Sequence, residues 1–313
     1  MVKRTRRAGV AGAERPLSYG MATSVTVRVH ATSANLGSGF DSLGMALALT
    51  QDVTLEFGYQ PEGRDGLSRL VLDAARSAYR LAHVEVPELR ASGTQPIPIG
   101  RGLGASAAAR AAGIVGANAL MGGTLTDAQM LSLGAGLEGH ADNMAPALFG
   151  GLRVVVRAAD GAYTHLASPI AAGLKVVLFI PEFEMPTGES RKLLPQQLSK
   201  DDAVHNIGRA ALLVAALATG AWDVLDLATQ DKLHQPARAS LFPAMLDIFA
   251  AAKDAGALCA YLSGGGSTIA AFAIEHEERI ARTMMQCAIS RGHSGRTEIT
   301  LPSAEGALVV GAG

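Results

Sequence analysis

The chain has 313 residues, of which 49% are hydrophobic, 18% charged and 4% aromatic, and its net charge is −1. This composition excludes a disordered chain and favours a packed protein large enough for two lobes. The longest apolar stretches, such as 176–180 and 210–217, fall well short of the roughly 20 residues of a membrane-spanning helix, so we expect no membrane partner. Two cysteines, Cys259 and Cys287, without CxxC spacing indicate neither a disulfide framework nor a structural zinc site and fit a cytoplasmic protein.

The charge is unevenly distributed along the chain. The first fifteen residues sum to +4, which leaves −5 for the rest. We expect the basic segment 1–21 to be a flexible tail, because termini commonly disorder and this one lacks the apolar region of a secretory signal. A contact of the tail with nucleic acid or anionic lipid is the alternative. Since the remainder is acidic and poor in aromatic residues, we expect no nucleic-acid partner.

Two strands are predicted near the start of the chain. Val25, Val27 and Val29 alternate with polar residues, and 53–57 repeats this period of two, which is typical of half-buried strands. Between them lies the polar connection 31–44, rich in Ser, Asn and Gly and longer than folding alone usually requires. This connection is a candidate binding loop.

A glycine-rich segment, 96–106, leads directly into an alanine-rich run, 107–120, that is expected to be a helix. Glycines allow backbone N–H groups to converge, and a helix N-terminus adds positive charge, so the arrangement suits phosphate oxygens. It is not a Walker A loop, because Ala105 stands where the lysine would be, and no βαβ dinucleotide motif accompanies it. A simple structural turn is the alternative.

Both helices and strands are predicted in the rest of the chain. Thr126 and Gln129 are spaced as a capping box, and the helix that follows should end near Gly139. Later segments predict buried strands at 152–156 and 176–180, a helix with the spacing of Val204, Ile207, Ala211 and Val214, and a strand, glycine turn and strand over 261–274. The fold class is α+β, with a boundary near residue 172 between lobes at 22–172 and 173–313.

Several segments resemble one protein family. The loop at 98–108, PIGRGLGASAA, is similar to the phosphate loop of the GHMP kinases, the superfamily of galacto-, homoserine, mevalonate and phosphomevalonate kinases. Within this superfamily, further segments of the chain resemble motifs of the homoserine kinases. They are ATSANLGSGFD (31–41), EGHADN (138–143), Pro186-Thr187 with Arg191, LHQPAR (233–238) and LSGGGS (262–267). One such motif alone would be weak evidence for the family, but the whole series of motifs in this order is specific to it.

The resemblance implies a two-lobed fold, with an N-terminal ribosomal-protein-S5-like lobe and a C-terminal ferredoxin-like lobe. It implies ATP-dependent phosphorylation of the side-chain hydroxyl of L-homoserine to O-phospho-L-homoserine, a step of threonine biosynthesis. Members of the superfamily often dimerise, so a homodimer is compatible with it. Contacts to the adenine ring are expected from variable loop residues, including part of 54–64.

Roles for the ATP site follow from the same resemblance. The phosphate loop would contact the nucleotide through Pro98, Gly100, Arg101, Gly102, Leu103, Gly104, Ala105, Ser106 and Ala107. Glu138 would bind Mg²⁺ together with Ser106, since a hard cation prefers oxygen ligands and usually takes one or two carboxylates plus phosphates. The ion would neutralise charge that develops during phosphoryl transfer.

Roles for the amino-acid site follow in the same way. Asn35 and Asp41 would take the ammonium group, while Arg191 and Arg238 would hold the carboxylate bidentately. His140, Asn143 and Thr187 would orient the hydroxyl that accepts the phosphoryl group. Asp142 has two readings: it supports the loop, as we expect, or it acts as a general base.

The motifs also depart from the family pattern. His30 and Ser38 replace prolines of the first motif, Ala141 replaces that of HPDN, and Gly265 and Ser267 replace Ala and Pro of the last. Ala105 replaces the first serine of GLGSS, and a methyl group cannot coordinate a metal, so we expect a Mg²⁺ requirement with weakened affinity. Two alternatives stay open: a GHMP kinase for a sugar, mevalonate or shikimate, and a non-catalytic protein that binds nucleotide or amino acid.

Overall fold

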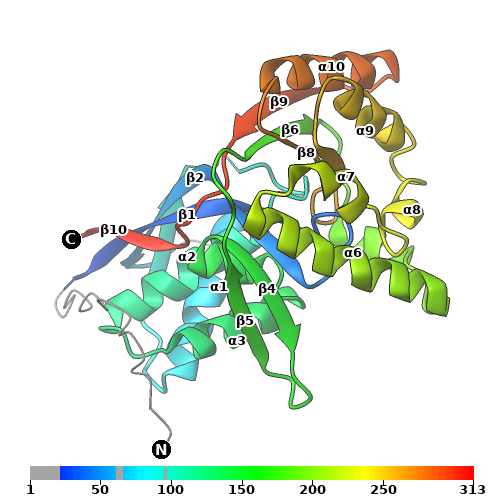
Figure 1. The fold of residues 1–313 in the computed structure, drawn as a ribbon. Coiled ribbons are helices and arrows are strands. Elements are labelled where there is room, and N and C mark those ends of the chain that lie inside the picture. Colours follow the sequence, from blue (N-terminus) through cyan, green and yellow to red (C-terminus); the bar gives the residue numbers. More distant parts are fainter. Residues whose placement is uncertain (1–21, 61–65, 95–96) are drawn as a thin grey trace, which may run out of the picture.

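The computed structural model describes residues 22–60, 66–94 and 97–313, so the predicted basic tail lies outside the described residues. Within these ranges the chain forms two antiparallel sheets flanked by helices (Figure 1), and the α+β prediction is confirmed. None of the described helices is both long enough and apolar enough to cross a membrane.

The first sheet has the strand order β10-β1-β2-β4-β5, with β3 also paired to β2. Its strands are β1 (Ser24–Ala34), β2 (Leu43–Phe57), β3 (Leu89–Gly93), β4 (Leu152–Arg157), β5 (Tyr163–Ser168) and β10 (Leu308–Ala312). Val25, Val27 and Val29 are buried, as their alternation predicts. The predicted connection 31–44 was too long: both strands extend further than expected, and only 35–42 joins them.

The second sheet has the order β7-β8-β6-β9. Its strands are β6 (Lys175–Pro181), β7 (Cys259–Leu262), β8 (Ile269–Ala273) and β9 (Gly295–Thr300). In β6, Val176, Leu178 and Ile180 join the core that also contains the buried residues of β1 and β2, while Val177 and Phe179 join a second core. Burial on both faces explains why this strand is an unbroken apolar run, and the prediction of a buried strand is confirmed.

Helices cover both sheets. The structure has α1 (Gly66–Leu81), α2 (Ala105–Leu120), α3 (Asp127–Glu138), α4 (Met144–Phe149), α5 (Thr187–Lys192), α6 (Lys200–Thr219), η1 (Trp222–Val224), α7 (Leu225–Ala228), α8 (Gln235–Arg238), α9 (Met245–Asp254) and α10 (Glu277–Ser290). The helix α2 packs on β1 and β2 and contacts α1, α3 and α4, while α9 and α10 contact the second sheet (Figure 1).

The helix and strand predictions differ from the structure in detail. The capping box of Thr126 and Gln129 and the end of α3 at Gly139 are confirmed. The predicted burial of 152–156 is wrong in part, because Val156 is exposed on β4. The helix α6 forms as predicted, but Val204 and Ile207, which carried its apolar spacing, face solvent.

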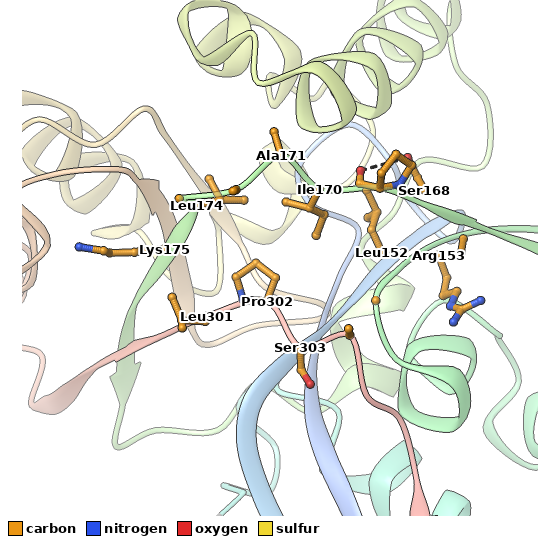
Figure 2. Close-up of a pocket in the computed structure, with 16 residues that line it drawn as sticks. Leu152, Arg153, Ser168, Ile170, Ala171, Leu174, Lys175, Leu301, Pro302 and Ser303 are labelled. Atoms are coloured by element: carbon orange, nitrogen blue, oxygen red, sulfur yellow. Dashed lines mark hydrogen bonds between the residues drawn. The ribbon is translucent and has the colours of Figure 1, made fainter. Parts of the chain in front are cut away.

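The chain crosses between the two sheets twice. The segment 169–174 leads from β5 to β6, where the lobe boundary was predicted, and 301–307 leads back from β9 to β10, so the first sheet is completed by the end of the chain. A cavity of about 770 Å³ lies between these crossings, with Ile170, Leu174 and Pro302 around it (Figure 2). It shares no lining residue with the site described next.

Candidate active site

The predicted phosphate loop is built on three glycines with left-handed backbone. Gly100, Gly102 and Gly104 have φ of +65°, +73° and +67°, a region that disfavours residues with a Cβ. Gly104 is the N-cap of α2, so the helix begins at Ala105, two residues earlier than predicted. Ser106 therefore lies in the first helical turn, where N–H groups lack intrahelical partners and the helix carries partial positive charge.

Neighbouring backbone and side chains surround this loop closely. A Cβ on Gly102 would lie 2.1 Å from the carbonyl oxygen of Ser263, and one on Gly104 would lie 1.9 Å from Oγ1 of Thr32. The Ser263 hydroxyl donates to the Gly102 carbonyl at 2.7 Å, and Thr32 donates to Oδ1 of Asn143 at 2.7 Å. The glycine turn at 263–267 and the strand β1 therefore fix the position of the loop.

Glu138, the predicted metal ligand, is the last residue of α3 and its side chain is only 9% exposed. Its carboxylate accepts hydrogen bonds from the Ser106 hydroxyl and from Arg110, which lies one turn further along α2. The described residues contain no group of three or more His, Cys, Asp and Glu side chains that could hold a metal ion on their own. A metal held by Glu138 would complete its coordination with water or with oxygen atoms of a bound molecule.

His140 and Asp142 form a pair beside this carboxylate. Nδ1 of His140 lies 2.6 Å from Oδ1 of Asp142, which also accepts the backbone N–H of Asn143 at 2.9 Å. Burial by itself would lower the pKa of His140, but the hydrogen bond and charge of Asp142 act in the other direction, and the net result is a raised pKa. Asp142 thus holds both His140 and the turn that carries Asn143.

The connection 35–42 brings acidic and amide groups to the other side of the site. Asn35 donates to the Gly264 carbonyl at 2.9 Å and accepts the backbone N–H of Asp41 at 3.0 Å, so both ends of its amide hold backbone. The Asp41 carboxylate is paired with the Arg191 guanidinium through both oxygens. This hydrogen bonding raises the pKa of Arg191 further above its ordinary value.

Arg238 differs from Arg191 because its partners are neutral. Its side chain is buried, and Nη1 donates to Nδ1 of His234 at 2.9 Å and to the Gly264 carbonyl at 3.1 Å. Its Nε is buried and has no hydrogen-bond partner among the described residues. Burial, and then the charge of Arg191, lower the pKa of Arg238 to about 10. This cation is thus desolvated, and no carboxylate among the described residues is bonded to it.

One cavity of about 110 Å³ joins these groups. Its lining includes the predicted residues Asn35, Pro98, Gly100, Gly102, Leu103, Gly104, Ala105, Ser106, Glu138, His140, Asp142, Asn143, Arg191 and Arg238. Asp41 lies behind Arg191 and does not line it, and the guanidinium of Arg101 turns away to the carbonyls of Pro181 and Glu182. Ala107 is buried in the core, and the side chain of Thr187 lies outside the described part of the structure.

Comparison with known proteins places this site in a family. Family models for the GHMP kinases N terminal domain and the GHMP kinases C terminal match residues 69–151 and 210–288. A homoserine kinase of Moorella thermoacetica is 41% identical over 91% of this chain and 99% of its own length. The chain belongs to the homoserine kinase family. A second family relative, a homoserine kinase of Thermus thermophilus, is 41% identical over 86% of this chain and 93% of its own length.

The family fold is also shared. A crystal structure of homoserine kinase from Cytophaga hutchinsonii superposes with a TM-score of 0.83 at 27% identity, and the match covers 93% of this chain and 98% of that one. The GHMP kinase fold predicted from the motifs is therefore confirmed.

Sequence reasoning missed several residues of the site. Gly264 and His234 stand inside motifs that resemble the family, yet nothing in the motifs indicated that they contact Arg238. Thr32 likewise stands in the first motif and contacts Asn143 across 111 residues of chain. Arg110 carried no signal, because an arginine on a helix is usually solvated. The contact of His234 with Arg238 is local, four residues along the chain, whereas the contacts of Gly264, Thr32 and Arg110 join more distant segments, which spacing alone does not give.

Proposed function

We propose that the chain transfers the γ-phosphoryl group of ATP to the side-chain hydroxyl of L-homoserine, giving O-phospho-L-homoserine and ADP. The observation that supports this most is the single cavity in which the glycine loop at the start of α2, Glu138, Arg191 and Arg238 come together. A helix N-terminus suits the phosphates, and a desolvated guanidinium suits a carboxylate. The relatives described above carry the name homoserine kinase.

The amino-acid side of the site suits a substrate carboxylate. Arg238 is bonded to no carboxylate in the described part of the chain, so it can take the homoserine carboxylate, with Arg191 beside it. Asp41 would take the ammonium group only by releasing Arg191, because both of its oxygens are paired with that guanidinium and it does not line the cavity. Mevalonate and sugars lack an ammonium group, so turnover with homoserine alone would indicate that this group is recognised.

The residues present also fit a Mg²⁺·ATP substrate. Glu138 and Ser106 would hold the ion, since one carboxylate and a hydroxyl beside phosphate oxygens are the donors that Mg²⁺ usually accepts. When bound, the ion would neutralise part of the negative charge of the phosphates. The protein's own contribution would be the backbone N–H groups at the start of α2 and the position of Glu138, which is held by Arg110.

In the transfer itself, the hydroxyl oxygen bonds to the γ-phosphorus while the bond from that phosphorus to the oxygen of ADP breaks. The transition state of such reactions is loose, so positioning matters more than a strong base. Asp142 bonds Nδ1 of His140, which leaves Nε2 as the ring nitrogen that can face the hydroxyl. The hydroxyl proton is released late in the step and leaves with the product or solvent.

The test is an ADP-release assay with homoserine, mevalonate and galactose as acceptors, with the phosphorylated product identified by ³¹P NMR. We expect turnover with homoserine and none above background with the others, and Glu138→Gln should reduce the rate strongly. Turnover with another acceptor would replace homoserine by that substrate class. Absence of turnover with every acceptor, together with tight ATP binding, would establish the non-catalytic alternative.

A further inference from the structure

His234 is a buried histidine of the site that the predicted roles leave out. It precedes α8, and its ring is fully buried beneath the connection 35–42. Nε2 lies 2.7 Å from the carbonyl oxygen of Gly37, and Nδ1 lies 2.9 Å from Nη1 of Arg238. The ring also stacks on Phe40, with centroids 5.3 Å apart, and the guanidinium of Arg238 lies 5.6 Å from the same ring.

These two hydrogen bonds determine the protonation of the ring. A carbonyl oxygen can only accept, so Nε2 of His234 must carry the hydrogen and donate to Gly37. A guanidinium can only donate, so Nδ1 must present a lone pair to Arg238. The ring is therefore the neutral Nε2–H tautomer. Burial and the charge of Arg238 also lower the pKa of His234, to about 4, against the opposing charge of Asp231, whose Oδ2 lies 3.6 Å from Nε2.

The surrounding turn holds the ring in this orientation. The Asp231 carboxylate is completely buried and accepts the backbone N–H groups of Leu233, His234 and Gln235 at 2.7–2.9 Å. Asn206 donates a further hydrogen bond to it at 2.7 Å. With its carboxylate occupied in this way, Asp231 fixes the position of the backbone from which the His234 ring extends.

We infer that His234 is a positioning residue that orients Arg238 for the homoserine carboxylate without cancelling its charge, and that ties Arg238 to the connection 35–42 through Gly37. A neutral acceptor directs the guanidinium, whereas an acidic residue in its place would neutralise it, as Asp41 does for Arg191. The full positive charge of Arg238 stays available to one incoming carboxylate. This inference rests on the proposed function, because it assumes that Arg238 meets the substrate.

The test compares three substitutions of His234. His234→Asn keeps an oxygen at the δ position that can accept from Arg238, His234→Gln keeps a donor at the ε position for Gly37, and His234→Phe keeps only the stacked ring. A hydrogen bond to a charged group is strong enough that its loss should raise KM for homoserine about tenfold or more. We expect this rise in the Gln and Phe variants, a smaller one in the Asn variant, and kcat and KM for ATP within about threefold of wild type.

The chain offers a matched control. His165 stacks on Phe149 with Arg153 beside it, so it repeats the Phe, His and Arg arrangement outside the site. His165→Phe should leave KM for homoserine unchanged. If the Gln and Phe variants of His234 keep the wild-type KM, or if the Asn variant loses as much as they do, the inference is wrong.

A second measurement needs no substitution. In ¹⁵N-labelled protein, two-dimensional NMR should show the hydrogen of His234 on Nε2 and Nδ1 unprotonated at pH 7.5, and a hydrogen on Nδ1 would overturn the inference. This result is independent of turnover. A wild-type chain that fails to phosphorylate homoserine would refute the proposed function, while the NMR spectrum would still decide whether His234 is the acceptor for Arg238.

Discussion

Gly104→Ala is the substitution for which the structure gives the clearest estimate. An alanine at φ +67° costs about 1–2 kcal/mol because its Cβ approaches the following carbonyl. The new Cβ would also displace the Thr32 hydroxyl, which lies 1.9 Å from its ideal position, and would leave Oδ1 of Asn143 without its donor. A buried acceptor without a partner costs about 1–3 kcal/mol. We therefore expect a total loss of about 2–5 kcal/mol in the free energy of unfolding.

The control for this estimate is Gly122→Ala, just after the same helix. Gly122 has φ +77°, but nothing lies within 4 Å of an added Cβ, so it reports the backbone penalty alone. Urea unfolding of both variants would give the difference, and a fluorescent nucleotide would show whether Gly104→Ala also weakens binding at least about tenfold. If the two variants lose the same stability, the described contact of the loop with Thr32 is wrong.

The remaining predictions concern the metal, the base and the pH dependence. Ala105→Ser should lower the Mg²⁺ concentration for half-maximal rate, because it adds a hydroxyl next to Ser106, and an unchanged value would dismiss this explanation. Asp142→Asn should reduce turnover less than about 10³-fold, since an amide can still support the turn; a larger loss with unchanged fold and ATP affinity would make Asp142 a general base. NMR titration should place the pKa of His140 above 6.5 and show it falling in Asp142→Asn, where burial dominates. Because the pKa is raised, the stability from this pair is fully present below pH 6.5 and lost as pH rises through the folded value; no dependence on Asp142 would contradict the pairing.

Local patterns predicted much of the fold. The alternation in β1, the apolar run of β6 and the capping box of α3 each depend on side chains within a few residues, and all three form. The predicted start of α2 was two residues too late. The helix begins after Gly104, which is its N-cap and has a left-handed backbone, and helix propensity does not indicate where a loop with such a glycine ends. Val204 and Ile207 of α6 are exposed although their spacing predicted a buried face. Apolar spacing identifies one face of a helix but does not show whether another element covers that face.

The candidate site was predicted less completely than the fold. The motifs predicted that Arg191 and Arg238 belong to one site, and both line the same cavity. They did not show that Asp41 neutralises Arg191 while Arg238 has neutral partners. That distinction depends on segments about 150 residues apart in the chain. Arg101 shows the opposite error: it stands within the phosphate loop, yet its side chain bonds carbonyls of the second lobe.

The two-sided burial of β6 limits how the molecule can close around a substrate. A rotation of one lobe against the other would have to withdraw Val176, Leu178 and Ile180 from a core that they share with β1 and β2, which close packing makes unfavourable. Large hinge motion is therefore a poor route to enclosing the reactants. The reactants must instead be enclosed with the lobes held in place, so changes of acceptor specificity should be sought among the residues that line the cavity rather than at the junction of the lobes.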